Sequence, residues 1–140
     1  MSKLSPGSGF RLNPRAGFLS ASPTVGIGYA TGAGGTVTQL TDRVTGVTLN
    51  TITGTITTST ASLAAEATAD FVVTNSTVAI GDTVVLSMRS GSNSGGTLIN
   101  VSTVAAGSFT IRVHNGNVAA GTAETGAIII NYAIIKGVSA

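Results

Sequence analysis

Cysteine is absent from this 140-residue chain, and histidine occurs once. The lack of thiols excludes disulfide bridges, a cysteine nucleophile and cysteine-ligated metal sites. The one histidine, His114, has no second histidine with which to share a metal, so we expect no metal site and no cofactor. The length is that of one ordinary domain, which can bury a core without such cross-links.

Charge is also scarce, because only 9% of the residues are charged and the net charge is +2. A typical soluble domain carries roughly 25% charged residues. The small net charge and the scattered aromatic residues argue against a nucleic-acid partner. Mean hydropathy is high, at +0.44, which indicates a surface covered by partners, or one kept in solution by Thr, Ser and Asn.

The chemistry of catalysis has few candidate groups. The carboxylates are scattered, and they are Asp42, Glu66, Asp70, Asp82 and Glu124. Glu66 and Asp70 would lie on one face only if the segment from Ser62 to Ala69 were a short helix. Enzymes place titratable groups in convergent pairs, and no such pair is evident here, so we expect a protein that is not an enzyme.

Targeting signals are missing as well. The first residues contain no apolar segment followed by a cleavage signature, so we expect no signal peptide. The longest apolar run, from Ala127 to Ile135, is far shorter than the roughly 18 residues of a spanning helix, so we expect no membrane partner.

Residues 1–24 differ in composition from the rest. They hold all three prolines, several glycines and serines, and no acidic residue. This composition predicts an extended basic arm, which is either a disordered leader or a docking segment. Its candidate docking residues are the cations and aromatics Lys3, Phe10, Arg11, Arg15 and Phe18.

From residue 25 to 140 we expect one all-β domain. Short runs rich in Val, Ile and Thr alternate with turns containing Gly, Asn and Asp, which is typical of an antiparallel β-sandwich, jelly-roll-like in its winding. The turn Ala105-Ala106-Gly107 predicts a hairpin. The expected strands are 26–30, 36–41, 46–50, 54–58, 71–74, 83–88, 98–104, 108–114 and 127–136.

The last expected strand is apolar on both faces. One face carries Ile128, Ile130, Tyr132 and Ile134, and the other carries Ile129, Asn131, Ala133 and Ile135. A small sandwich offers a core on one side only, so the second side needs either a partner subunit or the folded-back arm. We favour the subunit, and assign self-association to the face with Ile128, Ile130, Tyr132 and Ile134.

Two patterns favour other functions only weakly. The glycine-rich stretch from Gly26 to Gly35 lacks dinucleotide-binding spacing and the lysine of a phosphate-binding loop. The threonine rows from Thr51 to Thr57 resemble an ice-binding face, but the fixed repeat of such a solenoid is missing. Turn glycines and ordinary strand threonines account for both.

Four segments carry a resemblance to a known family. They are VGIGYATGAGGTVTQLTDRVTGVTLN (Val25 to Asn50), FVVTNSTV (Phe71 to Val78), VAAGSFTIRVHN (Val104 to Asn115) and INYAIIKG (Ile130 to Gly137). In this order they resemble small bacteriophage virion proteins, of the kind that act as cement or decoration proteins on the icosahedral heads of short-tailed phages. Residues 1–24 have no counterpart in the resemblance.

The resemblance implies a jelly-roll-like β-sandwich that associates with itself, with a dimer favoured and a trimer possible. It would bind the major capsid protein on the capsid exterior and stabilise contacts between capsid subunits, after synthesis in the host cytoplasm. The alternative is a tail-fibre or other host-recognition module of the virion. Such a module needs exposed aromatics or a groove with convergent carboxylates, and the sequence is poor in both.

Overall fold

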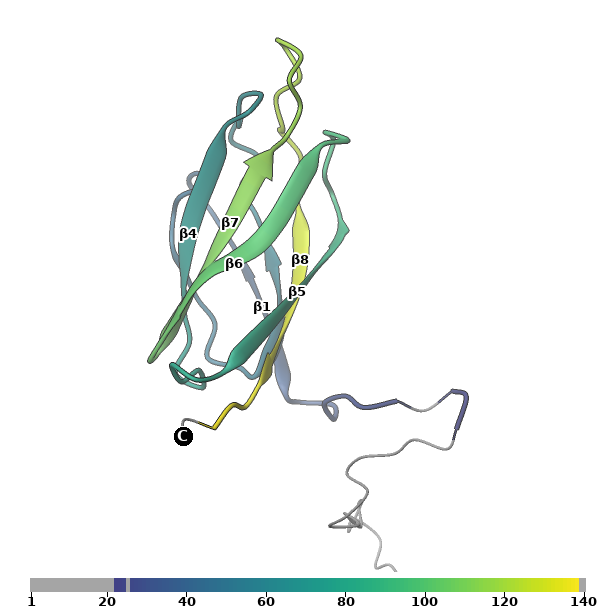
Figure 1. Ribbon diagram of the computed structural model, residues 1–140, viewed down its shortest axis with the longest axis vertical. Coiled ribbons are helices and arrows are strands. Elements are labelled where there is room, and N and C mark those ends of the chain that lie inside the picture. The colour runs from purple at the N-terminus through teal and green to yellow at the C-terminus, as the bar shows by residue number, and fades with distance from the viewer. Residues whose placement is uncertain (1–21, 25, 139–140) are drawn as a thin grey trace, which may run out of the picture.

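The computed structural model describes residues 22–24 and 26–138, and these residues form a sandwich of two four-stranded β-sheets (Figure 1). The first sheet has the order β1 (Gly34–Thr38), β3 (Thr53–Thr57), β8 (Ile129–Ile135), β5 (Thr83–Ser90). The second has the order β2 (Val47–Thr48), β4 (Thr68–Thr74), β7 (Ser108–Asn115), β6 (Thr97–Ala105). The all-β sandwich predicted from the sequence is confirmed.

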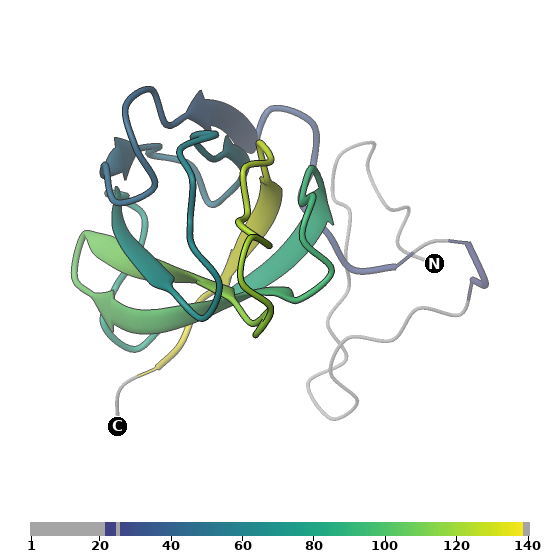
Figure 2. The ribbon, with the colours of Figure 1, turned by 90° about the horizontal axis from the view of Figure 1, so that it is seen from above.

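The chain crosses between the two sheets at every connection except the β6–β7 hairpin. The chain therefore alternates between the two layers along most of its length. The hairpin turns at Gly107, which has a φ of 79° that side-chain-bearing residues rarely adopt. Figure 2 looks along the sandwich and shows the two layers enclosing a common interior.

The pairing is not antiparallel throughout. β3, β5 and β8 pair antiparallel, as do β4, β6 and β7, but β1 runs parallel to β3 and β2 runs parallel to β4. The two parallel strands lie at sheet edges and precede the six antiparallel ones in the chain. The expectation of a fully antiparallel sandwich is therefore corrected at these two edges.

The core lies between the sheets and is built from side chains that alternate inward along each strand. Phe109 of β7 meets Tyr132 of β8 with ring centroids 5.3 Å apart, which joins the sheets at the centre. Gly54 lies against this contact, because a Cβ there would approach the Tyr132 ring to 2.9 Å. The buried apolar residues are Val47, Ile56, Leu63, Ala69, Phe71, Val73, Val78, Phe109, Ile111, Val113, Ile128, Ile130, Tyr132 and Ile134.

One expected strand is absent from the described residues. The run 26–30 forms no strand; it has two glycines, and the side chain of Ile27 is 75% exposed. The segment from Ser62 to Ala69, which the sequence leaves open as a short helix or an ordered loop, is not helical and contains a bridge between Leu63 and Glu124, a turn, and the start of β4. Burial of Leu63 and pairing with a distant segment outweigh the weak propensity of a two-turn helix.

Candidate interaction surface

A buried carboxylate organises one end of the sandwich. Glu124 is fully buried and accepts hydrogen bonds from the hydroxyls of Ser92 and Thr97, each at 2.5 Å, and from the amide of Gly126 at 2.7 Å. Burial by itself raises the pKa of Glu124, but these hydrogen bonds, with the amide of Asn93, outweigh it and lower the pKa to about 2. The side chain therefore stays charged and ties the segment from Ser92 to Thr97 to its own loop.

Arg43 closes the same end without forming an ion pair with the Glu124 carboxylate. Its guanidinium donates to the carbonyls of Ala61 at 2.5 Å, Gly126 at 2.8 Å and Glu124 at 3.2 Å. Burial lowers the pKa of Arg43, and the negative charge of Glu124 opposes that effect. The two buried charges thus anchor loops that are far apart in the sequence.

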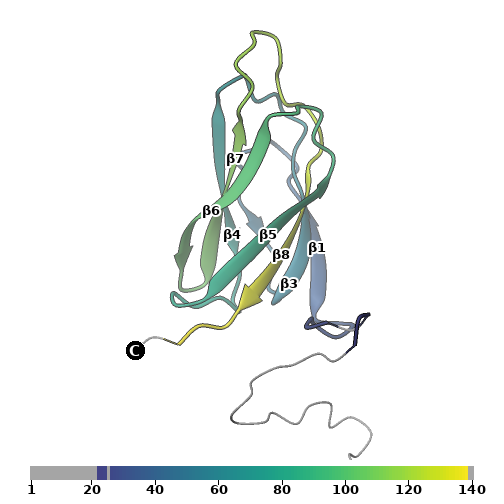
Figure 3. The same ribbon diagram turned by 45° about the vertical axis from the view of Figure 1, so that its right-hand side comes forward.

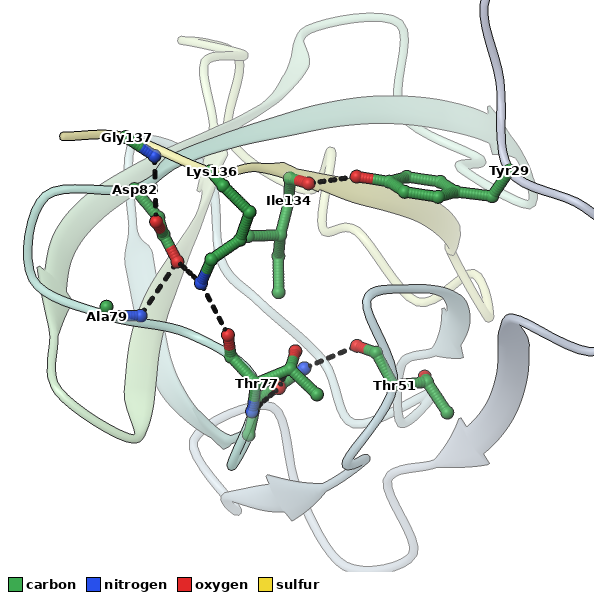
Figure 4. A network of polar contacts seen from close by, with 9 residues as sticks. Tyr29, Thr51, Thr77, Ala79, Asp82, Ile134, Lys136 and Gly137 are labelled. Atoms are coloured by element: carbon green, nitrogen blue, oxygen red, sulfur yellow. Dashed lines mark hydrogen bonds and ion pairs between the residues drawn. The ribbon is translucent and has the colours of Figure 1, made fainter. Parts of the chain in front are cut away.

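A second carboxylate organises the opposite end, where the chain leaves β8 (Figure 4). Asp82 pairs with the ammonium group of Lys136 and accepts from the amides of Ala79 at 2.8 Å and Gly137 at 2.9 Å. Lys136, with these amides, lowers the pKa of Asp82 to about 2. In both clusters the carboxylate oxygens accept hydrogen bonds from donors of the chain itself. Glu124 and Asp82 therefore hold loops in place.

Tyr29 fastens the segment before β1 to the first sheet at this same end. Its hydroxyl donates to the carbonyl of Ile134 on β8, as Figure 4 shows. The last residue pair between β3 and β8 is Thr53 with Ala133, so the hydroxyl meets β8 where that pairing stops. This hydrogen bond connects the exposed segment before β1 to the end of β8.

The outward face of the first sheet, which we call the threonine face, is nearly free of charge. Figure 3 shows this sheet with β1 at its outer edge. Strand register places Thr36, Thr55, Asn131 and Ser87 in one row across all four strands. The outward side chains of the face are Thr36, Thr38, Thr53, Thr55, Thr57, Thr83, Val85, Ser87, Arg89, Ile129, Asn131, Ala133 and Ile135.

A shallow depression of about 420 Å³ lies in the threonine face, and Arg89 and Asn131 help to line it together with glycines of β1 and β3. Arg89 is the one charged residue of the face, and within the described part of the chain it has no hydrogen-bond or ion-pair partner. A face of hydroxyl and methyl groups with one available guanidinium is suited to contact a protein surface.

The outward face of the second sheet, which we call the ion-pair face, carries opposite charges. Arg112 of β7 forms a bidentate pair with Asp70 of β4, at 2.8 and 2.7 Å, and His114 contacts the hydroxyl of Thr68 at 3.1 Å. Arg112 is exposed on this face, and His114 is half-buried. These charged groups already have partners within the sheet, so they offer less to another molecule than Arg89 does.

The predicted self-association residues occupy the wrong face of β8 for that role. Ile128, Ile130, Tyr132 and Ile134 are at most 2% exposed, because they form the core between the two sheets. The assignment of self-association to these side chains is therefore corrected: they hold one chain together. The side of β8 open to a partner carries Ile129, Asn131, Ala133 and Ile135 on the threonine face.

The predicted docking residues Lys3, Phe10, Arg11, Arg15 and Phe18 lie outside the described residues. Sequence reasoning did not assign structural roles to Arg43 and Glu124. Apart from Gly126, which lies two residues from Glu124, their partners lie 15 to 83 residues away in the chain, so no local pattern marks them.

No group of three or more His, Asp or Glu side chains suited to a metal occurs in the described part of the chain. Within the same residues, no helix is long and apolar enough to cross a membrane. Comparison of the chain with protein-family models, with curated proteins and with solved structures yields no match.

Proposed function

We propose that this protein is a structural component of a bacteriophage virion, which decorates the outside of the icosahedral head and bridges neighbouring major capsid subunits. Three things support the proposal: the resemblance carried by GYATGAGGTVTQ and the three later segments, the β-sandwich fold, and the threonine face. The threonine face is the observation that carries it, because it is a broad, nearly uncharged surface with no described covering.

The threonine face suits a repeated, non-catalytic contact. Thr hydroxyls and methyls can meet a protein surface without removing unpaired charges from water. Strand spacing and rise give the face a footprint of about 400 Å². A stable interface needs roughly 800 Å² on each partner, so one face alone supplies a weak contact. On a shell with many equivalent sites, linked weak contacts add through effective concentration.

A decoration protein stabilises the shell that it binds. A ligand with affinity for the assembled shell, and little for dissociated subunits, shifts the equilibrium toward assembly. We include the basic arm in the proposal as a second contact, with Lys3, Arg11 and Arg15 lying on an acidic capsid surface. Deletion of residues 1–20 should then weaken shell binding without changing the unfolding midpoint, and unchanged binding would exclude the arm as a contact.

The experiment that tests the function is a copy-number measurement on purified virions of the phage that encodes the chain. Quantitative mass spectrometry should give a ratio to the major capsid protein near one, or a simple fraction of one repeated over the head. Purified protein should also co-sediment with shells that lack it. A copy number typical of tail components would overturn the decoration role and favour a fibre or adaptor.

A further inference from the structure

Strand β1 is an unprotected sheet edge. Natural proteins protect edge strands with charges, bulges, prolines or very short length, because open backbone groups invite another strand. In the described sheets, β2 is two residues long, β5 contains Arg89 and an irregular register, and β6 contains a register shift. β1 has five residues, GGTVT, with none of these devices.

The backbone of β1 leaves polar groups directed away from the sheet. The amide of Gln39 donates to the carbonyl of Thr57 at 2.9 Å, so the residues that alternate with it, Val37 and Gly35, also face β3. Gly34, Thr36 and Thr38 therefore direct their N–H and C=O groups outward. These groups have no partner strand among the described residues.

An exposed apolar side chain follows this edge. Gln39 is buried, and Leu40 on the opposite side of the chain is 89% exposed, in line with Thr36 and Thr38. Upstream, a turn contains Gly32, where an added Cβ would meet no atom within 4 Å. An apolar side chain thus lies at one end of the edge and an open space at the other.

We propose that the β1 edge binds the β1 edge of a second copy of this chain, in antiparallel register about a two-fold axis at Thr36. In that register Thr36 faces Thr36 of the second copy, and Gly34 faces Thr38. Up to about six backbone hydrogen bonds then form between the outward groups. Leu40 of each copy lies over the turn at Gly32 of the other.

A second copy is the occupant that the chemistry of the edge favours. The sequence from Gly32 to Thr41 has no charged residue, so two copies meet without like-charge repulsion. A two-fold contact is also self-complementary: Thr36 meets Thr36 of the second copy, and the same Gly34–Thr38 pair forms on both sides of the axis. This edge argument does not rest on the proposed function.

The pairing would also extend the threonine face. Two copies joined at β1 form one eight-stranded sheet across the pair, and their combined footprint rises from about 400 to about 800 Å², the size of a stable contact. This area argument does rest on the proposed function. A dimer of this kind can reach two neighbouring shell subunits.

The test uses the absence of native cysteine. In the full chain, Thr36→Cys places two thiols on the two-fold axis with Cα atoms about 5.5 Å apart, a separation that a disulfide bridges. Mild oxidation should give a covalent dimer. The matched control is Thr55→Cys, in the same cross-strand row but one strand inside the sheet, and it should remain uncrosslinked. Equal crosslinking of both variants would overturn the proposal.

A second measurement avoids added thiols. Sedimentation velocity from low to high micromolar should show a monomer–dimer equilibrium for the native chain. Thr36→Pro removes an outward amide that no described group uses, and it should weaken dimerisation at least tenfold. Thr36→Val retains the amide and should dimerise like the native chain. A native chain that stays monomeric, or that dimerises only after residues 1–21 are removed, would overturn the proposed self-pairing. If that monomer still binds shells, the proposed function stands independently of the pairing.

Discussion

The two sheets share one core but differ in what they present outward. On the ion-pair face, Asp70 and Arg112 satisfy each other within the sheet. On the threonine face, thirteen outward side chains include one charged residue, Arg89, which has no partner in the described chain. Strands of similar composition therefore give one face whose opposite charges pair with each other and one whose single charged side chain is unpaired in the described chain.

The largest change in stability should come from the inner face of β8, and the same change on its outer face should have little effect. Ile130→Asp places a charge in a core position that is fully buried, and we expect it to remove about 4 kcal/mol or more of the free energy of unfolding. Ala133→Asp, on the threonine face of the same strand, should cost about 1 kcal/mol or less. Urea unfolding of both variants measures the difference. Similar losses would contradict the assignment of the two faces.

The next effect should come from the buried carboxylate. Glu124→Gln removes the charge that accepts from Ser92 and Thr97, and we expect a loss of about 2 kcal/mol. Glu66→Gln makes the same chemical change on an exposed residue and should leave the unfolding midpoint unchanged. If Glu124→Gln were equally silent, the loops at that end would be held by something else.

The two carboxylate clusters should also set the acid stability. The pKa values of Glu124 and Asp82 are lowered to about 2, and unfolded Glu and Asp titrate near pH 4. Their stabilising contribution is complete above about pH 5 and is lost as the pH falls toward 2, because the unfolded chain then binds protons first. Thermal unfolding followed from pH 7 to pH 2 should show this decline, and the decline should be shallower in Glu124→Gln. A parallel curve would show that Glu124 is not a source of the acid sensitivity.

The smallest effect should come from the ion-pair face. Asp70→Asn breaks an exposed pair, and such pairs contribute little. We expect a slight fall in the midpoint of thermal unfolding at low salt, and no difference from the native chain at high salt, where exposed charges are screened. A large loss that persists at high salt would mean that the two outward faces differ less than described.

The sequence predicts strands well where side chains alternate, as from Ser108 to Asn115, because a half-buried strand imposes that period on the chain. It also marks the two-sided apolar character of β8. It cannot say which of two apolar faces turns inward: Tyr132 meets Phe109 in the core, a contact set by the packing of the whole sandwich. The parallel pairing of β1 with β3 could not be predicted either, because the residues of β1 would suit an antiparallel neighbour equally well.

The buried charges were beyond prediction for a related reason. Glu124 receives hydrogen bonds from residues 27 to 32 positions earlier in the chain, and the hairpin of β6 and β7 lies between them. Asp82 meets Lys136 only after β5 and β8 pair. Turns can be predicted from local sequence, whereas the partners of a buried charge depend on the topology of the whole fold.

One comparison tests the central claim most directly, which is that the threonine face is the docking surface of a head-decoration protein. Thr55→Lys places a charge at the centre of the threonine face, and Thr110→Lys places the same charge at the centre of the ion-pair face. Both variants should fold, and co-sedimentation with shells lacking the protein should show at least a tenfold loss of binding for Thr55→Lys and near-native binding for Thr110→Lys. Equal binding by the two variants, or loss only in Thr110→Lys, would contradict the account.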